Sequence, residues 1–304
     1  MNPRDARTKA LTVFAPAKIN LYLHVTGRRG DGYHLLDSLV AFADIGDRLS
    51  FAPANDFLFD IQGPYAAAFP AGERDASPRS SNLAVRAVWA LSGAVQRPPQ
   101  VRMMLTKNLP LASGLGGGSA DAAAELWGLL EWWGIDAASV PGFDGLMRGL
   151  GADVPACLSC GPQWVTGTGE NLAPAELPEM PVVLVNPGRL CRTADVFAGF
   201  GGDFGAAAEK PAVLDDAGGV IAFLAAQDNM LTRAAVKLVP EISSAQASLE
   251  KQPGCRLARM SGSGATCFGL FDDEGAAIAA AENIMTQNPR WWVRAGTLNR
   301  PERY

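Results

Sequence analysis

The amino-acid sequence predicts an α+β fold with two lobes. The chain has 304 residues, beyond the size at which one hydrophobic core usually keeps growing. Segments typical of strands and of helices both occur, and the helices do not alternate strictly with the strands. Residues 171–181 hold three prolines. We therefore expect a linker there, between an N-terminal domain over 1–170 and a C-terminal domain over 182–304.

The part before the linker shows strand patterns and two helices. Residues 11–25 are rich in β-branched and apolar types, and we expect an interruption at Ala15-Pro16. Asn82 is expected to cap the first helix. The elements expected are strands at 11–25, 38–51 (with a break at 44–46) and 100–106, a loop over 52–80 with a short strand near 57–61, and helices at 82–91 and 119–133. The second helix places Ala123, Leu126, Leu130 and Trp133 on one face, with Glu125 and Glu131 elsewhere.

The part after the linker contains further strands and helices. A tight Ser-Gly-Ser-Gly turn is expected at 261–264, between two strands. The elements expected are strands at 182–186, 256–260, 265–271 and 291–297, and helices at 219–238, 241–251 and 274–286.

Composition narrows the class of protein. The formal net charge is −5 without a basic stripe, which disfavours a nucleic-acid partner. No apolar run approaches the ~18 residues of a membrane span, and the N-terminal apolar stretch is too short for a signal peptide. Five cysteines, an odd number, suit a reducing compartment, so we expect a cytoplasmic protein. Cys157 and Cys160 form a C-x-x-C without a second pair, which favours buried thiols over a metal or redox role.

The most informative segment is the glycine-rich stretch from Pro110 to Ala120, which lies between a predicted strand and a predicted helix. Free backbone N–H groups and the helix dipole favour an anion such as phosphate at this position. Glycines at 114 and 116–118 let the backbone approach phosphate oxygens closely. Ser119 is expected to cap the helix and to offer a hydroxyl to phosphate or Mg²⁺. A flexible connecting loop is the alternative, and Walker, Rossmann, protein-kinase and hydrolase-elbow motifs are absent.

The stretch P-L-A-S-G-L-G-G-G-S-A at 110–120 resembles the second motif of the GHMP kinases, a superfamily that includes galactokinase, homoserine kinase and mevalonate kinase. The segment P-A-K-I-N-L at 16–21 resembles the first motif, and S-G-S-G-A at 261–265 resembles the third. Within the superfamily, G-R-R-G-D-G-Y-H at 27–34 and G-A-D-V-P at 151–155 are most similar to the diphosphocytidyl-methylerythritol kinases of non-mevalonate isoprenoid biosynthesis. This resemblance covers roughly residues 12–300. The pairs Ala112-Ser113 and Ala156-Cys157 depart from the pattern.

The resemblance implies an ATP-dependent kinase with its active site in the cleft between an ATP-binding N-terminal domain and a C-terminal GHMP domain. Asp153 would accept the proton of the substrate hydroxyl, and Lys18 would hold Asp153 ionised and neutralise charge. A helix-capping role for Asp153 and a snorkelling role for Lys18 are the alternatives.

The substrate implied by the resemblance is a small molecule with a cytidine diphosphate group. Tyr33 and Phe197 would stack on the two faces of its cytosine, and His34 would hydrogen-bond the base edge. Asn20 and Thr193 are candidates for the sugar alcohol and the phosphate, and Thr168 for a backbone contact.

The residues implied for ATP lie in three segments: Lys107; Pro110, Leu111, Ala112, Ser113, Gly114, Leu115, Gly116, Gly117, Gly118, Ser119 and Ala120; and Gly262, Ser263 and Gly264. Lys107 is almost equally plausible as a solvated lysine at a strand end, and residues 262–264 as an ordinary hairpin turn. Mg²⁺ is expected with ATP, carried by the phosphates and Ser119, and no carboxylate cage for a metal is seen.

Two other classes of function stay open. A nucleotide-binding regulatory module with a decayed site would typically lack the lysine or the carboxylate, and Lys18 and Asp153 are both present. An RNA-binding role would rest on fold analogy alone and is disfavoured by the acidic charge. The sequence leaves the oligomeric state open.

Overall fold

The structure, a computed structural model, describes residues 10–300 of the chain. Its strands are β1 (Leu11–Arg28), β2 (His34–Pro53), β3 (Leu58–Gln62), β4 (Val101–Thr106), β5 (Gln163–Gly167), β6 (Asn171–Pro174), β7 (Met180–Asn186), β8 (Cys255–Met260), β9 (Cys267–Phe271) and β10 (Trp292–Leu298). Its α-helices are α1 (Leu83–Ala94), α2 (Gly117–Trp133), α3 (Phe143–Leu150), α4 (Val154–Ser159), α5 (Thr193–Ala198), α6 (Ala217–Ala225), α7 (Thr232–Leu238), α8 (Glu241–Glu250) and α9 (Glu274–Gln287). Short 3₁₀ helices occupy Ala66–Ala68, Ala71–Glu73 and Ala137–Ser139.

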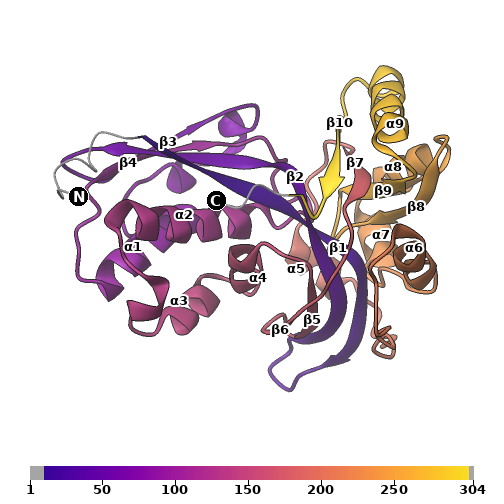
Figure 1. The fold of residues 1–304 in the computed structure, drawn as a ribbon, viewed down its shortest axis with the longest axis horizontal. Coiled ribbons are helices and arrows are strands. Elements are labelled where there is room, and N and C mark those ends of the chain that lie inside the picture. The colour runs from indigo at the N-terminus through magenta and orange to yellow at the C-terminus, as the bar shows by residue number, and fades with distance from the viewer. Residues whose placement is uncertain (1–9, 301–304) are drawn as a thin grey trace.

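The strands form a mixed sheet with helices packed against it (Figure 1). Hydrogen-bonded neighbours follow the order β3-β4-β2-β10-β7-β9-β8, while β1 pairs with β2, and β5 pairs with both β2 and β6. β2 and β10 are joined through the single residue pair Ala43 and Leu298. The predicted α+β class is confirmed, and the sheet consists of two parts that meet at this pair.

β1 and β2 form one long antiparallel hairpin, and its outer end reaches the C-terminal helices (Figure 1). The predicted breaks at Ala15-Pro16 and at 44–46 are wrong as strand interruptions, because both strands continue through them. Instead the pairing register shifts there, between Pro16 and Lys18. Such a bulge changes the direction of nearby side chains without ending the strand. Asp44, on the bulged segment of β2, accepts a hydrogen bond from the Thr297 N–H at 2.7 Å.

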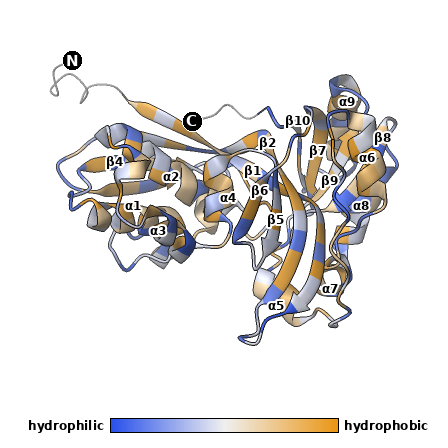
Figure 2. Cartoon of the chain, turned by 60° about the horizontal axis from the view of Figure 1, so that its bottom comes forward, coloured by the Kyte–Doolittle hydropathy of each residue, from blue (hydrophilic) through white to orange (hydrophobic). Residues whose placement is uncertain are grey.

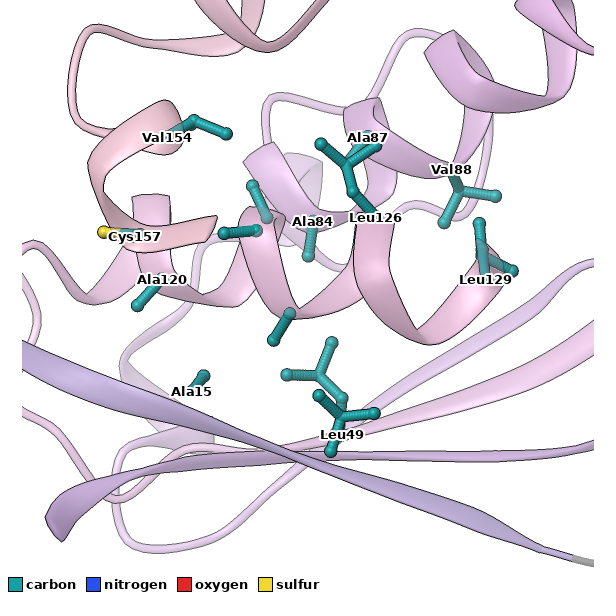
Figure 3. Packing of buried hydrophobic residues seen from close by; sticks show 14 of the residues in the cluster. Ala15, Leu49, Ala84, Ala87, Val88, Ala120, Leu126, Leu129, Val154 and Cys157 are labelled. Atoms are coloured by element: carbon teal, nitrogen blue, oxygen red, sulfur yellow. The ribbon is translucent and has the colours of Figure 1, made fainter. Parts of the chain in front are cut away.

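α1 and α2 cover the N-terminal strands and bury a common apolar layer (Figure 3). The predicted cap is confirmed, since the Asn82 side chain accepts a hydrogen bond from the Ala84 N–H. α2 begins at Gly117, two residues before the predicted start. A Cβ atom at Gly128 would lie 2.4 Å from Cζ of Phe51, so glycine at this position lets α2 lie close to the sheet.

The C-terminal strands carry a second apolar layer between the hairpin and helices α7–α9. β7 is hydrophobic over most of its length (Figure 2) and almost wholly buried. The single helix predicted over 219–238 is wrong: α6 and α7 are separated by residues 226–231. There the Asn229 side chain donates to the carbonyl oxygens of Met260 and Gly262, each at 2.8 Å. A continuous helix would not provide this support for the Ser-Gly-Ser-Gly turn.

The predicted linker over 171–181 begins with a strand. β6 pairs with β5, so residues 171–174 belong to the N-terminal part of the sheet. The division into domains at 1–170 and 182–304 stays a prediction, and its outer ends, 1–9 and 301–304, lie outside the described residues. The strands and α-helices of residues 10–300 that the sequence did not predict are α3, α4, α5, β5 and β6.

The helical pattern had suggested that Glu125 of α2 lies on a solvated face, and this is wrong. It is fully buried, and neither carboxylate oxygen has a hydrogen-bond partner. Burial raises its pKa well above 4.5, since a charged carboxylate is poorly solvated in an apolar layer. Glu125 is therefore held neutral in the folded protein, whereas Glu131 of the same helix is exposed.

We expect Glu125→Gln to raise stability, and more so at pH 8 than at pH 5. Above a pH of about 4.5 the unfolded chain loses the Glu125 proton while the folded chain keeps it, so wild-type stability falls as pH rises. A neutral amide of the same shape removes this loss. Urea unfolding midpoints at the two pH values measure the effect, with Glu131→Gln as the control. Equal midpoints for Glu125→Gln and wild type at pH 8 would contradict the prediction.

Candidate active site

The glycine-rich stretch forms a tight loop that leads directly into α2. Gly114 and Gly116 have φ angles of 78° and 63°, which glycine adopts without strain. Gly116 occupies the N-cap position, so the backbone N–H groups of the first turn of α2 are free to bind an anion. The sequence had suggested that Ser119 caps the helix. This prediction is wrong, because Ser119 is the third residue of α2.

The Ser-Gly-Ser-Gly turn packs against this loop. The Ser261 hydroxyl donates to the Gly114 carbonyl oxygen at 3.0 Å and accepts from the Asn20 N–H at 3.1 Å. The Thr266 N–H donates to the Ser113 carbonyl oxygen at 3.0 Å. Two of the three predicted motifs are therefore in direct contact, and Ser261 also links them to β1.

Lys18 and Asp153 come together from distant segments. Nζ of Lys18 lies 3.1 Å from Oδ1 of Asp153, and it donates to Oδ1 of Asn20 at 3.1 Å. The Lys18 side chain is 7% exposed, while that of Asp153 is 42% exposed at the start of α4. The Lys18 backbone N–H donates to the Leu115 carbonyl oxygen at 2.9 Å, which ties β1 to the glycine loop. A buried ammonium is thus placed next to a carboxylate that solvent reaches.

Two cavities meet at this carboxylate. One, of about 560 Å³, is lined by the glycine loop, Gly262 and Ser263. The other, of about 710 Å³, is lined by Tyr33, His34 and neighbouring residues. The residues that line both are Leu36, Ser119, Asp153, Thr168, Thr193 and Phe197. A molecule in each cavity would therefore reach Asp153 from a different side.

The second cavity has aromatic walls. The His34 ring stacks on Phe197 with centroids 5.0 Å apart, and Phe200 contacts His34 edge-on at 5.8 Å. Tyr33 is 64% exposed, with the Arg29 guanidinium 5.6 Å from its ring centre. Partial burial, with a smaller contribution from Arg28, lowers the pKa of His34. His34 therefore stays neutral near pH 7, with one ring nitrogen as donor and the other as acceptor.

The other predicted substrate contacts also line these cavities. The Thr193 hydroxyl lies 2.9 Å from that of Ser263, and Asn20 donates through Nδ2 to the Ser38 hydroxyl at 2.8 Å. The Thr168 N–H and hydroxyl both bond to the Glu170 carboxylate, so that N–H is already used.

Lys107 is not a solvated lysine at a strand end. It is buried, and its ammonium lies 2.6 Å from Oδ2 of Asp47 and 2.6 Å from Oδ2 of Asp121. Its charge is therefore already shared with two carboxylates, although Lys107 also lines the first cavity.

Three predicted nucleotide contacts, unlike Lys107, do not line either cavity. The side chains of Leu115 and Ala120 are fully buried in the apolar core, and Gly264 packs on Met260 and Ile242. Lining residues that were not predicted include Arg28, Asp31, Phe69, Glu73, Ser81, Asn82, Leu83 and Asp121. Most of them belong to turns or irregular segments, and Asn82 had been recognised only as a helix cap.

Residues 10–300 contain no group of three or more histidine, cysteine or acidic side chains arranged to hold a metal ion. Cys157 and Cys160 are buried, and burial raises the pKa of the Cys157 thiol well above 9. In the same part of the chain, no helix has the length and apolar character needed to cross a membrane.

Comparison with known families gives two matches. Residues 82–161 match the family model described as GHMP kinases N terminal domain, and residues 214–289 match GHMP kinases C terminal. Together the two matches cover more than half of the chain. A homoserine kinase structure from Cytophaga hutchinsonii, at 17% identity and a TM-score of 0.67, shares the fold.

More similar proteins belong to one branch of this superfamily. The 4-diphosphocytidyl-2-C-methyl-D-erythritol kinase of Cereibacter sphaeroides (strain KD131) is 49% identical, over 92% of this chain and 96% of that protein. The enzyme of the same name from Paramagnetospirillum magneticum is 44% identical, over 95% and 99%. A crystal structure of 4-(cytidine 5'-diphospho)-2C-methyl-D-erythritol kinase has a TM-score of 0.76 at 35% identity, over 95% and 99% of the two chains. The chain therefore belongs to the GHMP kinases and, within them, to the 4-diphosphocytidyl-2-C-methyl-D-erythritol kinase family.

Proposed function

We propose that this protein transfers the terminal phosphoryl group of ATP to a hydroxyl of 4-diphosphocytidyl-2-C-methyl-D-erythritol, in the non-mevalonate pathway of isoprenoid biosynthesis. The observation that carries the proposal is the position of Asp153, which lines both cavities and is paired with Lys18. Phosphoryl transfer needs the attacking hydroxyl and the leaving oxygen roughly in line with the phosphorus, so donor and acceptor must meet where the two cavities join. We place the protein in the cytoplasm.

The first cavity suits ATP. The N–H groups at the start of α2 have no partner within the helix, and Gly116, Gly117 and Gly118 line this cavity. Ser263, from the Ser-Gly-Ser-Gly turn, lines the same cavity. Mg²⁺ would ride on the phosphates, with the Ser119 hydroxyl within the shared lining, and would neutralise phosphate charge when bound.

Asp153 is the proposed general base and Lys18 its electrostatic partner. The exposed carboxylate can take the proton of the substrate hydroxyl, and the Lys18 ammonium 3.1 Å away stabilises its charged form. Asn20 accepts a hydrogen bond from the same ammonium, which fixes its orientation. Lys18 also lies where negative charge grows on the attacking oxygen, so it would stabilise the transition state.

The second cavity suits the cytidine group. Tyr33 and Phe197 supply flat apolar surfaces for the base, and neutral His34 supplies a donor and an acceptor for its edge. Thr193 lies at the junction, where the sugar alcohol and the phosphates would pass.

The activity itself is tested by incubating the protein with ATP, Mg²⁺ and 4-diphosphocytidyl-2-C-methyl-D-erythritol and measuring ADP release. We expect turnover with this alcohol and none with homoserine or phosphomevalonate. Turnover with one of the latter alone would identify a sister kinase. Binding of ATP without turnover of any alcohol would instead indicate a nucleotide-binding regulatory module.

We expect Asp153→Asn to lower kcat by about 10²–10⁴-fold with little change in either KM, because it removes the base without removing a binding surface. Lys18→Met is expected to lower kcat by at least about 10²-fold. Steady-state kinetics measure both. Asp144→Asn, at an exposed position on α3, is the control and should match wild type. Near-wild-type turnover in Asp153→Asn would exclude Asp153 as the base.

We expect Phe197→Leu to raise KM for the cytidine substrate by about tenfold and to change KM for ATP much less, although Phe197 lines both cavities. The loss of one aromatic stacking partner corresponds to about 0.5–1.5 kcal/mol beyond the lost area. Phe57→Leu is a matched control, because Phe57 packs edge-on against Trp89 in the N-terminal part, away from both cavities. An equal rise in both KM values would show that Phe197 does not act on the base.

A further inference from the structure

A buried charge cluster lies beneath the phosphate-binding loop and has no role in the mechanism above. It consists of Lys107, Asp47 and Asp121, which come from the end of β4, from β2 and from the first part of α2. All three side chains are at most 5% exposed. Both carboxylates lie 2.6 Å from the same Nζ atom, so the lysine charge is shared between them.

The two carboxylates differ in their second oxygen. Oδ1 of Asp47 accepts the backbone N–H groups of Asn108 at 2.6 Å and Leu109 at 2.9 Å. These residues lead directly into the glycine loop at Pro110. Oδ1 of Asp121, by contrast, is buried without a hydrogen-bond partner. Of the two carboxylates, therefore, only Asp47 also bonds to the backbone that enters the loop.

The cluster lies immediately under the first residue of α2. A Cβ atom at Gly117 would lie 3.1 Å from Nζ of Lys107 and 3.7 Å from Oδ2 of Asp47. The Lys107 backbone is fixed as well, because its N–H donates to the Gln62 carbonyl oxygen at 2.8 Å. The cluster thus touches both ends of the glycine loop, the entry at 108–109 and the exit at Gly117.

The charges in the cluster do not balance. One ammonium faces two carboxylates, so one carboxylate is enough to neutralise Lys107. Burial, followed by the charge of Asp47, raises the pKa of Asp121, although Lys107 opposes this change. Asp121 is therefore the carboxylate in surplus, and Asp47 is the one that also contacts the backbone leading into the loop.

We propose that Asp47, oriented by Lys107, is a positioning residue that holds the entry of the phosphate-binding loop in the shape that binds ATP. This inference rests on the proposed function, since it assigns the loop to ATP. Lys107 acts through Asp47, although it also lines the cavity assigned to ATP. The affinity of the loop for an anion then comes mainly from backbone N–H groups, because the Lys107 ammonium is paired with Asp47 and Asp121.

A matched pair of variants tests the proposal. Asp47→Asn and Asp121→Asn each remove one carboxylate 2.6 Å from the same ammonium and keep the side-chain shape. An asparagine at 47 cannot accept from Lys107 and from both N–H groups without turning its own NH₂ group toward a donor. An asparagine at 121 accepts from Lys107 through its one oxygen and exchanges one unpartnered atom for another.

We expect Asp47→Asn to weaken ATP binding by at least tenfold, measured by calorimetry without the acceptor alcohol, while KM for the alcohol stays within twofold. Asp121→Asn should change ATP binding by less than threefold. Thermal unfolding checks that both variants are folded. Equal effects of the two variants, or tighter ATP binding in Asp47→Asn because a freed lysine reaches the nucleotide, would overturn the proposal. So would a fall in Tm with unchanged ATP affinity.

A measurement on the wild-type protein covers the case in which Asp47→Asn does not fold. Amide hydrogen exchange should show the N–H groups of Asn108 and Leu109 protected before ATP is added, with protection unchanged afterwards. Protection that develops only with ATP would contradict a loop shaped in advance. Absence of any ATP binding by the wild type would refute the proposed function instead, which keeps the two failures distinct.

Discussion

The catalytic centre depends on one hydroxyl group, that of Ser261. It accepts the Asn20 N–H of β1 and donates to the Gly114 carbonyl oxygen of the glycine loop, and it is fully buried. Three segments far apart in the sequence are joined at this atom. Each of them carries one of the recognisable motifs, so the hydroxyl holds β1, which carries Lys18, against the glycine loop. Asn229 supports the turn from behind by bonding to two of its carbonyl oxygens.

Much of this arrangement could be predicted from the sequence. Local patterns located most strands and helices, because periodic burial leaves a clear signal in α1, α2 and α9. The motifs predicted that Lys18 and Asp153 would pair across 135 residues of chain, and the 3.1 Å contact agrees. Tyr33 and Phe197, which line the second cavity, were named in advance through the resemblance and not through any pattern in the chain itself.

Other features were not predictable, for identifiable physical reasons. The burial of Glu125 cannot be seen in a helical pattern, because an ionisable residue normally marks the solvated face and becomes neutral only after packing. The true setting of Lys107 depends on Asp47 and Asp121, which approach it only through the pairing of β2 with β4 and the packing of α2. The break between α6 and α7 accompanies the hydrogen bonds of Asn229 to Met260 and Gly262. These are tertiary contacts, which local helix propensity cannot predict.

The single pair that joins the two parts of the sheet, Ala43 with Leu298, has a mechanical consequence. Because this ladder is a single pair, the two parts are also held together by the hydrogen bonds of Ser261 with Asn20 and Gly114 and of Thr266 with Ser113. These bonds also shape the site of phosphoryl transfer. The bonds that join the two parts of the molecule are therefore also bonds of the glycine loop, so a substitution that weakens one contact is expected to affect both.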